Sequence, residues 1–484
     1  MDYKIIGHNC GAAVVDMVQV FFPNEKYKGL KEDDFSPRFF ESRYESGLVS
    51  ACFFIDLHIA GKVVIPWPDG DMALGVKLSI YELFKDTYKP PWGLLTGIRP
   101  AKISSGMLAL GLSDINIISN MRDKFKVSAE KAELCLKIAG AERVILKKSK
   151  PGSYALYIGI PFCPSRCLYC SFTAYPIIKY AGLTALYVAA VKKELDYVAK
   201  LYAGQELESV YIGGGTPTSL DDECFSELLE YMSKIFEVCK LKEYTVEAGR
   251  PDTITEAKLD IMRKYGVSRI SINPQSMNNK TLKKIGRAHS AEDFVRAYEL
   301  ARKKGFCHIN IDLILGLPEE DEADVENTLK AAAILSPDEV TIHTLALKRA
   351  SKLKEEFDET SLAEARQMEF FLSLSKYYMD NFSYRPYYMY RQKNSPGNFE
   401  NVGYAKAGFG CLYNVQIMEE RQSIIAVGAG AVSKFVNLET NRIERAFNVK
   451  NVDEYIARIK EMTDRKTVAY NKAIRREEDN NADN

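Results

Sequence analysis

Three cysteines stand close together in the segment CPSRCLYC, at Cys163, Cys167 and Cys170, directly after the apolar run YALYIGIPF. Cysteine thiolates are the usual protein ligands of iron–sulfur clusters. Three of them on one short loop can hold three irons of a cubane cluster and leave the fourth iron without a protein ligand. The spacing therefore predicts a cluster with one open iron, where a small molecule could bind and react.

Two other interpretations of the cysteine motif are weaker. The CxxxCxxC spacing differs from the CxxC pairs of zinc ribbons and from the four-cysteine runs of ferredoxins, and no histidine follows at zinc-finger spacing. The second alternative is chance clustering in a core, since free cysteine packs as a small hydrophobic residue. Pro161 and Pro164 flank Cys163, and they favour a loop over a packed strand.

Strand-like and helix-like segments alternate from residue 154 to residue 346. The strand-like runs are YALYIGI, SVYIGGG, YTVEAG, VSRISINPQ, HINIDLILG and EVTIHTLA, and amphipathic stretches separate them. This alternation predicts an α/β fold, with a parallel sheet and helices outside it, as an open doubly wound sheet or a barrel. Six units favour a partial (β/α)6 barrel, in which the chemistry lies at the carboxyl ends of the strands.

Glycines and polar residues stand at the ends of these strands. GGGTPT, residues 213–218, closes the second strand, and glycines there let a ligand approach the backbone closely. Four more polar residues lie at or after the later strands: Glu247, Gln275, Arg287 and Asp312. A charge in an apolar segment is costly unless it has a partner. We therefore expect a ligand pocket; a simple glycine turn, solvated strand ends or a Glu247–Arg287 salt bridge are the alternatives.

The chain divides into four predicted parts. We predict an N-terminal α+β domain over 1–150, the barrel over 151–352, a smaller C-terminal domain over 353–470 and a disordered polar tail over 471–484. KKSKPGS, residues 147–153, marks the first boundary. In the first part, LVSACFFID and KVVIPWP predict a hairpin that turns at Ala60 and Gly61. A Pro-rich loop around Trp92 has a structural role by default, and covering the barrel mouth or binding a partner are the alternatives.

The composition is that of a globular protein. Of the 484 residues 46% are hydrophobic, and 65 basic residues balance 65 acidic ones. This balance does not favour a nucleic-acid partner. The apolar stretch 10–22 contains Asp16 and Gln19, so neither a signal peptide nor a membrane span is expected. We expect a cytoplasmic protein, where scattered cysteines stay reduced; Cys411, in the glycine-rich GFGCLYN, is a further candidate on the grounds of exposure.

The cysteine motif resembles the signature of radical S-adenosylmethionine (SAM) enzymes. In that family the open iron of a 4Fe-4S cluster chelates the methionine moiety of SAM, and one electron cleaves the cofactor to a 5'-deoxyadenosyl radical. YIGIPFCPSRCLYCSF, GGGTPT, ISINPQS and NIDLILGLP together resemble the oxygen-independent coproporphyrinogen dehydrogenase (HemN-like) family. PWGLLTGIRPAKI and HTLALKRASK are similar to its HemZ-type branch.

The resemblance implies a role for individual residues. Cys163, Cys167 and Cys170 would bind the cluster. Tyr157 and Tyr169 would lie beside SAM. The remaining residues implied in the SAM pocket are Gly214, Gly215 and Thr216 at the methionine moiety, Glu247 at the ribose, and Gln275, Arg287, Asp312, Ile314 and Ala346. No catalytic acid or base is implied.

The implied reaction is the oxidative decarboxylation of coproporphyrinogen III propionates to vinyl groups, with flavodoxin or ferredoxin as a typical electron donor. A haem-trafficking chaperone that keeps the cluster and SAM is one alternative. A radical enzyme acting on another tetrapyrrole is the other. Gly159, Ser171 and Phe172 depart from the family, whose porphyrinogen-oxidising members usually have His before the motif and a further Cys after it.

Residues in and directly after the sixth strand-like run could contact a tetrapyrrole. Lys348, Arg349 and Lys352 are candidate partners for propionates, although a run of Lys and Arg is more often a solvated face. His343 could bind haem iron in the chaperone interpretation. A lone histidine in an apolar strand is more often a hydrogen-bonded core residue.

Overall fold

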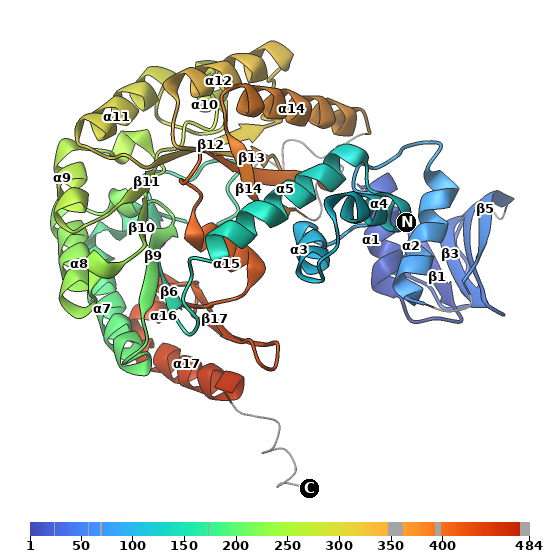
Figure 1. The fold of residues 1–484 in the computed structure, drawn as a ribbon, viewed down its shortest axis with the longest axis horizontal. Coiled ribbons are helices and arrows are strands. Elements are labelled where there is room, and N and C mark those ends of the chain that lie inside the picture. The colour runs from blue at the N-terminus through green and yellow to red at the C-terminus, as the bar shows by residue number, and fades with distance from the viewer. Residues whose placement is uncertain are drawn as a thin grey trace, which may run out of the picture.

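The computed structural model describes the chain except residues 24, 57, 68–69, 173, 347–361, 393–397 and 475–484. In the described ranges the strands form one sheet of eleven strands, one of five and one of two. Figure 1 shows the large sheet curving inside an arc of helices, with the five-stranded N-terminal sheet to one side.

The centre of the large sheet consists of the six predicted strands, which are all parallel and pair in chain order. Their bounds are β6 (Tyr154–Ile160), β9 (Leu207–Gly214), β10 (Glu243–Glu247), β11 (Arg269–Ser271), β12 (Ile309–Leu315) and β13 (Glu339–Thr344). Most positions are buried on both faces, as expected of a parallel sheet that is covered by helices. The predicted partial (β/α)6 barrel is confirmed.

Helices connect these strands and cover the outer face of the sheet (Figure 1). They are α6 (Ile177–Tyr180), α7 (Thr184–Leu201), α8 (Asp222–Ile235), α9 (Glu256–Lys264), α10 (Asn279–Lys284), α11 (Ala291–Lys303) and α12 (Glu322–Leu335). Several begin at a side-chain cap: Asp221 accepts from the Cys224 N–H at 2.7 Å, and Ser290 and Asp321 form capping boxes. These caps fix the starts of α8, α11 and α12 and therefore the ends of the loops that precede them.

The chain after residue 361 enlarges the same sheet. β16 (Ser423–Val427) pairs parallel with β6, and β15 (Glu400–Ala405) pairs antiparallel with β13. The other elements are α14 (Leu362–Asn381), β14 (Arg385–Arg391), α15 (Leu412–Glu419), β17 (Val432–Asn437), β18 (Arg442–Phe447), α16 (Val452–Ala457) and α17 (Ile459–Ile474). This part therefore shares its sheet and its core with the barrel. The predicted boundary at residue 352 lies outside the described residues.

The N-terminal part begins with the five-stranded sheet and two helices. These are β1 (Asp2–Ile6), α1 (Gly11–Phe21), β2 (Lys28–Gly29), β3 (Arg38–Glu45), β4 (Leu48–Ile55), β5 (His58–Pro66) and α2 (Met72–Phe84). β4 and β5 form the predicted hairpin, but the turn was placed wrongly: Ala60 and Gly61 lie inside β5. Asp56, with φ of 49°, lies near the turn. The register shifts opposite Gly61, which is the usual effect of glycine inside a strand.

Hydrophobic packing changes between about residues 88 and 94. One core holds residues from Ala13 to Leu94, and the main core runs from Trp92 to Ala473. The helices that follow Trp92 contribute to the main core; they are α3 (Ala101–Ala109), α4 (Asp114–Phe125) and α5 (Ala129–Leu146). The predicted N-terminal domain over 1–150 therefore includes helices whose apolar faces pack with the barrel, and the packing does not change at residue 150.

The last described helix, α17, continues to Ile474. The predicted disordered tail from residue 471 therefore begins too early, because Ala473 is buried in the main core. Residues 475–484 lie outside the described part of the chain. No helix in the described ranges is both long and apolar enough to cross a lipid bilayer.

Candidate active site

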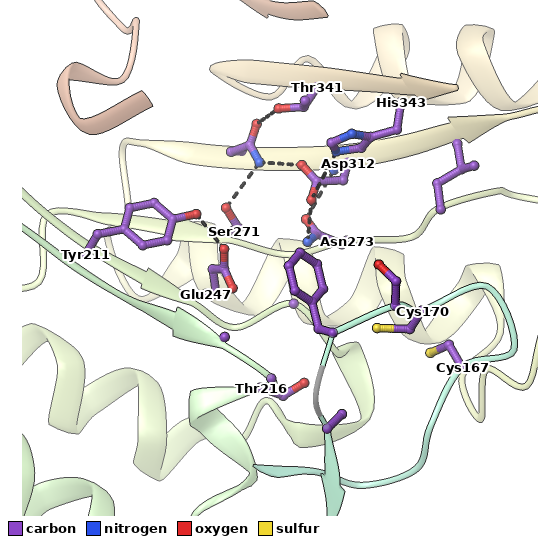
Figure 2. A pocket seen from close by; sticks show the side chains of 18 of the residues that line it. Cys167, Cys170, Tyr211, Thr216, Glu247, Ser271, Asn273, Asp312, Thr341 and His343 are labelled. Carbon is purple, nitrogen blue, oxygen red and sulfur yellow. Dashed lines mark hydrogen bonds and ion pairs between the residues drawn. The ribbon is translucent and has the colours of Figure 1, made fainter. Parts of the chain in front are cut away.

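The three cysteines lie on the loop after β6, at the carboxyl end of the parallel strands. The loop begins with β7 (Phe162–Cys163), which pairs with β8 (Tyr175–Pro176). The Leu168 N–H donates to the Ile285 carbonyl at 3.0 Å, and the Cys170 N–H donates to the Cys167 carbonyl at 3.1 Å. The first bond fixes the loop against the end of α10, and the second closes a turn within the loop. Figure 2 shows the Cys167 and Cys170 sulfurs at one end of a pocket.

The three thiols do not surround a single point. In the described part of the chain, no three His, Cys, Asp or Glu side chains are placed to hold one metal ion. A cubane carries its irons at separate corners, so three cysteine ligands need not converge. The Thr216 hydroxyl lies 3.5 Å from Cys163 Sγ. Burial raises the pKa of Cys163 to about 11 and raises that of Cys170, so cluster binding by thiolates is coupled to proton release.

The glycines after β9 lie directly against the cysteine loop. The Gly215 N–H donates to the Ile160 carbonyl at 2.8 Å. A Cβ atom on Gly215 would lie 2.5 Å from the Phe162 carbonyl oxygen and 3.0 Å from Cys163 Sγ. Gly214 has a φ of 108°, which residues with side chains rarely adopt. Contact with the loop therefore requires glycine here, and both Gly214 and Gly215 line the pocket.

Glu247 ends β10 and lines the same pocket as the cysteines. It accepts a hydrogen bond from the Tyr211 hydroxyl at 2.6 Å, and burial raises its pKa to about 7 (Figure 2). The Tyr211 ring stacks on Tyr413 and Tyr157, with centroids 4.5 and 6.2 Å away. The alternative salt bridge between Glu247 and Arg287 is not what the structure shows, because each side chain binds another partner.

Arg287 binds a tyrosine of the cysteine motif. Its Nε and Nη2 atoms donate to the Tyr169 hydroxyl at 3.2 and 2.8 Å, and its Nη1 atom donates to the Gly249 carbonyl at 3.0 Å. The guanidinium therefore connects the motif to the segment after β10. Sequence reasoning placed Tyr169 and Arg287 in one pocket, and the structure brings them into contact.

A layer of polar side chains crosses β11, β12 and β13 (Figure 2). Asp312 accepts hydrogen bonds from the side-chain amides of Asn273 at 2.8 Å and Asn310 at 2.9 Å. His343 Nε2 lies 3.7 Å from Asp312 Oδ2, and its Nδ1 lies 3.3 Å from the Tyr390 hydroxyl. Burial acts to raise the pKa of Asp312, but the hydrogen bond and charge of His343 bring it below its ordinary value. Both ring nitrogens of His343 thus have polar neighbours.

Gln275 has an unusual backbone and an unpartnered side-chain atom. Its φ is 69°, in the left-handed region, and its N–H donates to the Asp312 carbonyl at 3.0 Å while its carbonyl accepts from the Ile314 N–H at 2.9 Å. Its Oε1 atom is buried without a hydrogen-bond partner. A buried polar atom at a pocket wall fits a polar ligand there, because such atoms are otherwise paired. Ala346 lines the same pocket.

All fourteen residues that the sequence proposed for the cluster and the SAM pocket line one cavity of about 720 Å³. The cavity also reaches residues that sequence reasoning did not assign: Tyr388, Tyr390, Tyr413, Asn414 and Met418. These come from β14 and α15. The aromatic run YYMYR was the available signal, but a local pattern does not show which strand it will lie beside.

Three other predictions have different outcomes. Cys411 is not exposed: it is fully buried at the start of α15, and its Sγ donates to Glu243 at 3.1 Å, because the glycine-rich loop packs against the end of the sheet. Trp92 is also buried, and its Nε1 donates to Glu400 at 2.8 Å, so its role is structural. The proposed propionate partners lie outside the described residues; they are Lys348, Arg349 and Lys352.

A three-cysteine loop at the carboxyl end of a partial (β/α)6 barrel defines a radical SAM protein, and the family model of the radical SAM superfamily matches residues 157–332. The chain is 39% identical over 384 residues to the oxygen-independent coproporphyrinogen-III oxidase-like protein HemZ of Bacillus subtilis, across 78% of this chain and 76% of that protein. The chain therefore belongs to the HemZ-type branch of the HemN-like family of radical SAM proteins.

Two further comparisons involve differently named proteins. The heme chaperone HemW of Bacillus subtilis is 33% identical over 193 residues, which are 40% of this chain and 50% of HemW. The solved structure of coproporphyrinogen III oxidase HemN from Escherichia coli matches with a TM-score of 0.53 at 22% identity, covering 66% of this chain and 72% of HemN. At that identity the structural likeness supports the fold alone.

Family membership gives this chain a 4Fe-4S cluster and SAM as cofactors. The structure fits both. Three thiols lie on one loop at the pocket, and Gly215 leaves backbone beside Cys163 where any side chain would clash. The unpartnered Oε1 of Gln275 adds a buried polar atom for a polar cofactor.

Proposed function

We propose that the chain is a radical SAM enzyme that converts propionates of coproporphyrinogen III to vinyl groups by oxidative decarboxylation without oxygen. The observation that carries this proposal is the single cavity that joins the three cysteines to every strand-end residue of the family motifs. Its volume of about 720 Å³ lies in the range of cofactor and substrate pockets. The name of the HemZ relative supports the same substrate class.

Residues of this chain have distinct roles in the proposal. Cys163, Cys167 and Cys170 hold the cluster, and the backbone of Gly214 and Gly215 receives the methionine moiety of SAM. When bound, the two cofactors would supply one-electron cleavage of SAM and abstraction of a hydrogen atom from the substrate. Loss of CO2 and transfer of one electron from the substrate to an acceptor would then complete each vinyl group. The protein must orient the substrate C–H bond and keep water away.

Acid–base chemistry has a small part in this reaction, because the cofactors supply the reactive species. Glu247 accepts hydrogen bonds from ribose hydroxyls in the proposal, in addition to the one from Tyr211. The stacked rings of Tyr157, Tyr211 and Tyr413 close one side of the cavity with apolar surface. This surface limits the access of water to the reacting carbon.

The proposal is tested by turnover. Reduced, cluster-loaded protein is incubated without oxygen with SAM, coproporphyrinogen III and a flavodoxin or ferredoxin. Vinyl product together with 5'-deoxyadenosine supports the proposal. If 5'-deoxyadenosine forms only with another tetrapyrrole, the substrate assignment is wrong and the radical chemistry stands.

The ligand assignment is tested separately. We expect Cys167→Ala to lose the brown absorbance of the cluster and the cleavage of SAM, because one of three protein ligands is removed. Cys239→Ala is the matched control, since Cys239 is exposed and outside the motif. Wild-type iron content in the Cys167 variant contradicts the assignment.

A haem chaperone is the second candidate function. His343 lies in the cavity wall beside Asp312 and Tyr390, and the HemW relative supports this alternative. Stoichiometric haem binding without vinyl product, measured by the Soret absorbance and lost in His343→Ala, supports the chaperone. Haem binding that persists in that variant contradicts the role of His343 as an iron ligand.

A further inference from the structure

Arg250 contacts the cysteine loop from the segment that follows β10. Its side chain is buried, with only 3% of the residue exposed. Its Nη1 atom lies 3.5 Å from Cys167 Sγ, and Nη1 and Nη2 both lie 3.3 Å from the Ser165 hydroxyl. The guanidinium therefore donates directly to a sulfur that the proposed function assigns to the cluster.

The position of Arg250 is fixed by other protein groups. Its Nε and Nη2 atoms donate to the two carboxylate oxygens of Asp252 at 2.9 and 3.0 Å. Such a two-point contact orients the plane of the guanidinium. Its backbone carbonyl accepts from the Thr253 hydroxyl at 2.8 Å, within the 3-10 turn Pro251–Thr253. Nη1 is thereby held toward the loop.

We propose that Arg250 raises the reduction potential of the cluster through its hydrogen bond to Cys167. Hydrogen bonds to the sulfurs, net charge and burial set the potential of an iron–sulfur cluster. Reduction adds one negative charge to the cluster, and a buried positive charge close to a ligand sulfur stabilises the more negative state. The inference rests on the ligand assignment of the proposed function and adds a role that the family motifs did not name.

The charge of Asp252 offsets only part of this effect. The Asp252 side chain is 23% exposed, whereas that of Arg250 is 3% exposed, so water screens the carboxylate more than the guanidinium. Arg287, the other buried arginine at the loop, donates to Tyr169 and to a backbone carbonyl. Arg250 is therefore the arginine placed to shift the reduction potential of the cluster, and it acts through its contact with Cys167.

The experiment is a redox titration of the cluster-loaded protein, followed by electron paramagnetic resonance. For Arg250→Gln we expect about a tenfold lower ratio of reduced to oxidised cluster at a fixed potential, which is a midpoint about 59 mV lower for a one-electron couple. Iron content per chain should stay at the wild-type value. Arg250→Lys keeps the charge and should restore part of the shift. Arg296→Gln is the control, because its side chain is 68% exposed on α11.

Asp252→Asn provides a test with the opposite sign. Removal of the offsetting carboxylate should raise the midpoint, whereas loss of a merely structural anchor lowers iron content without a positive shift. An unchanged midpoint in iron-replete Arg250→Gln overturns the inference. If Arg250→Gln loses iron, the decision passes to Asp252→Asn. An unchanged or lower midpoint in Asp252→Asn, or loss of its iron, then overturns the inference. Wild-type protein that takes up no cluster overturns the ligand assignment itself, which distinguishes the two failures.

Discussion

Glu247 has a carboxyl group whose pKa is raised by burial from 4.5 to about 7. In the unfolded chain the group ionises near 4.5, so the folded state loses stability as the pH rises from there to about 7, and the loss is constant above. We expect Glu247→Gln to raise the melting temperature above pH 7 and to leave it unchanged below pH 4.5. Thermal unfolding measured above pH 7 and below pH 4.5 tests this expectation, with the exposed Glu223→Gln as control. Equal shifts of the melting temperature in the two pH ranges contradict it.

The same carboxyl group should make SAM binding depend on pH. A carboxylate accepts ribose hydroxyls better than a carboxylic acid, so wild-type affinity should increase as the pH rises through about 7. Glu247→Gln should bind more weakly and lose this dependence. Equilibrium dialysis with SAM gives both results, and a flat wild-type profile argues against a ribose contact.

Substitution of Gly215 tests whether close contact with the cysteine loop requires glycine at this position. In Gly215→Ala the new Cβ would lie 2.5 Å from the Phe162 carbonyl oxygen, so the cysteine loop must move. We expect lower iron content and weaker SAM binding. Gly106→Ala, in the interior of α3, has nothing within 4 Å of its Cβ and should gain up to about 1 kcal/mol from helix propensity. Normal iron content in Gly215→Ala contradicts the role of the close contact.

The type and spacing of single residues predicted much of the site. The cysteines and the glycines could be found because their chemistry and conformation are specific, and the strand-end carboxylates because a charge in an apolar run needs a partner. Arg250 could not be found in this way, because GRPD after a strand is equally a solvated turn. Cys411 was placed at the surface because a glycine-rich segment usually forms an exposed loop, whereas here it packs at a helix start.

A buried ion pair joins α7 to α17. Lys466 Nζ lies 2.5 Å from Glu194 Oε1, and both side chains are fully buried. Glu194 also accepts from Asn448 at 2.8 Å and from Tyr455 at 2.5 Å. The last helix is thereby fixed to the first long helix of the barrel.

Removal of one partner of this ion pair should lower the free energy of unfolding strongly. We expect Lys466→Met to destabilise the protein by about 3–5 kcal/mol, because Glu194 keeps a buried charge without its cation. In the exposed pair of Lys234 and Glu230, Lys234→Met should lower the stability far less, because water screens the two charges. Denaturant unfolding of both variants gives the comparison, and equal losses rule out a special role for the buried pair.

Local sequence patterns predicted the six central strands of the large sheet but not the C-terminal strands that pair beside them. Apolar runs and amphipathic stretches specify strands, helices and a parallel order, since each crossover needs a helix. The pairing of β16 with β6 joins residues more than 250 positions apart, and no local pattern contains it. The hairpin turn was misplaced because glycine suits a bulge and a turn equally well.

The core that holds residues from Ala13 to Leu94 is separate from the main core, which indicates two units of stability. We propose that the unit before about residue 90 unfolds separately from the barrel, because its buried residues form their own cluster. Phe40 and Phe225 are fully buried in different cores. Phe40→Ala should lower only one of two thermal transitions and Phe225→Ala only the other, each by a loss of about 3–5 kcal/mol. Calorimetry tests this, and one shared transition contradicts it.

The large sheet has β14 and β18 at its two ends in the described part of the chain, while the cysteine loop and the glycines follow β6 and β9 near its middle. A change in an end strand breaks the hydrogen-bond ladder of one neighbour only. Substitutions in β14 therefore reshape the cavity wall at Tyr388 and Tyr390, while the strands that present the cysteine loop and the glycines keep both of their neighbours.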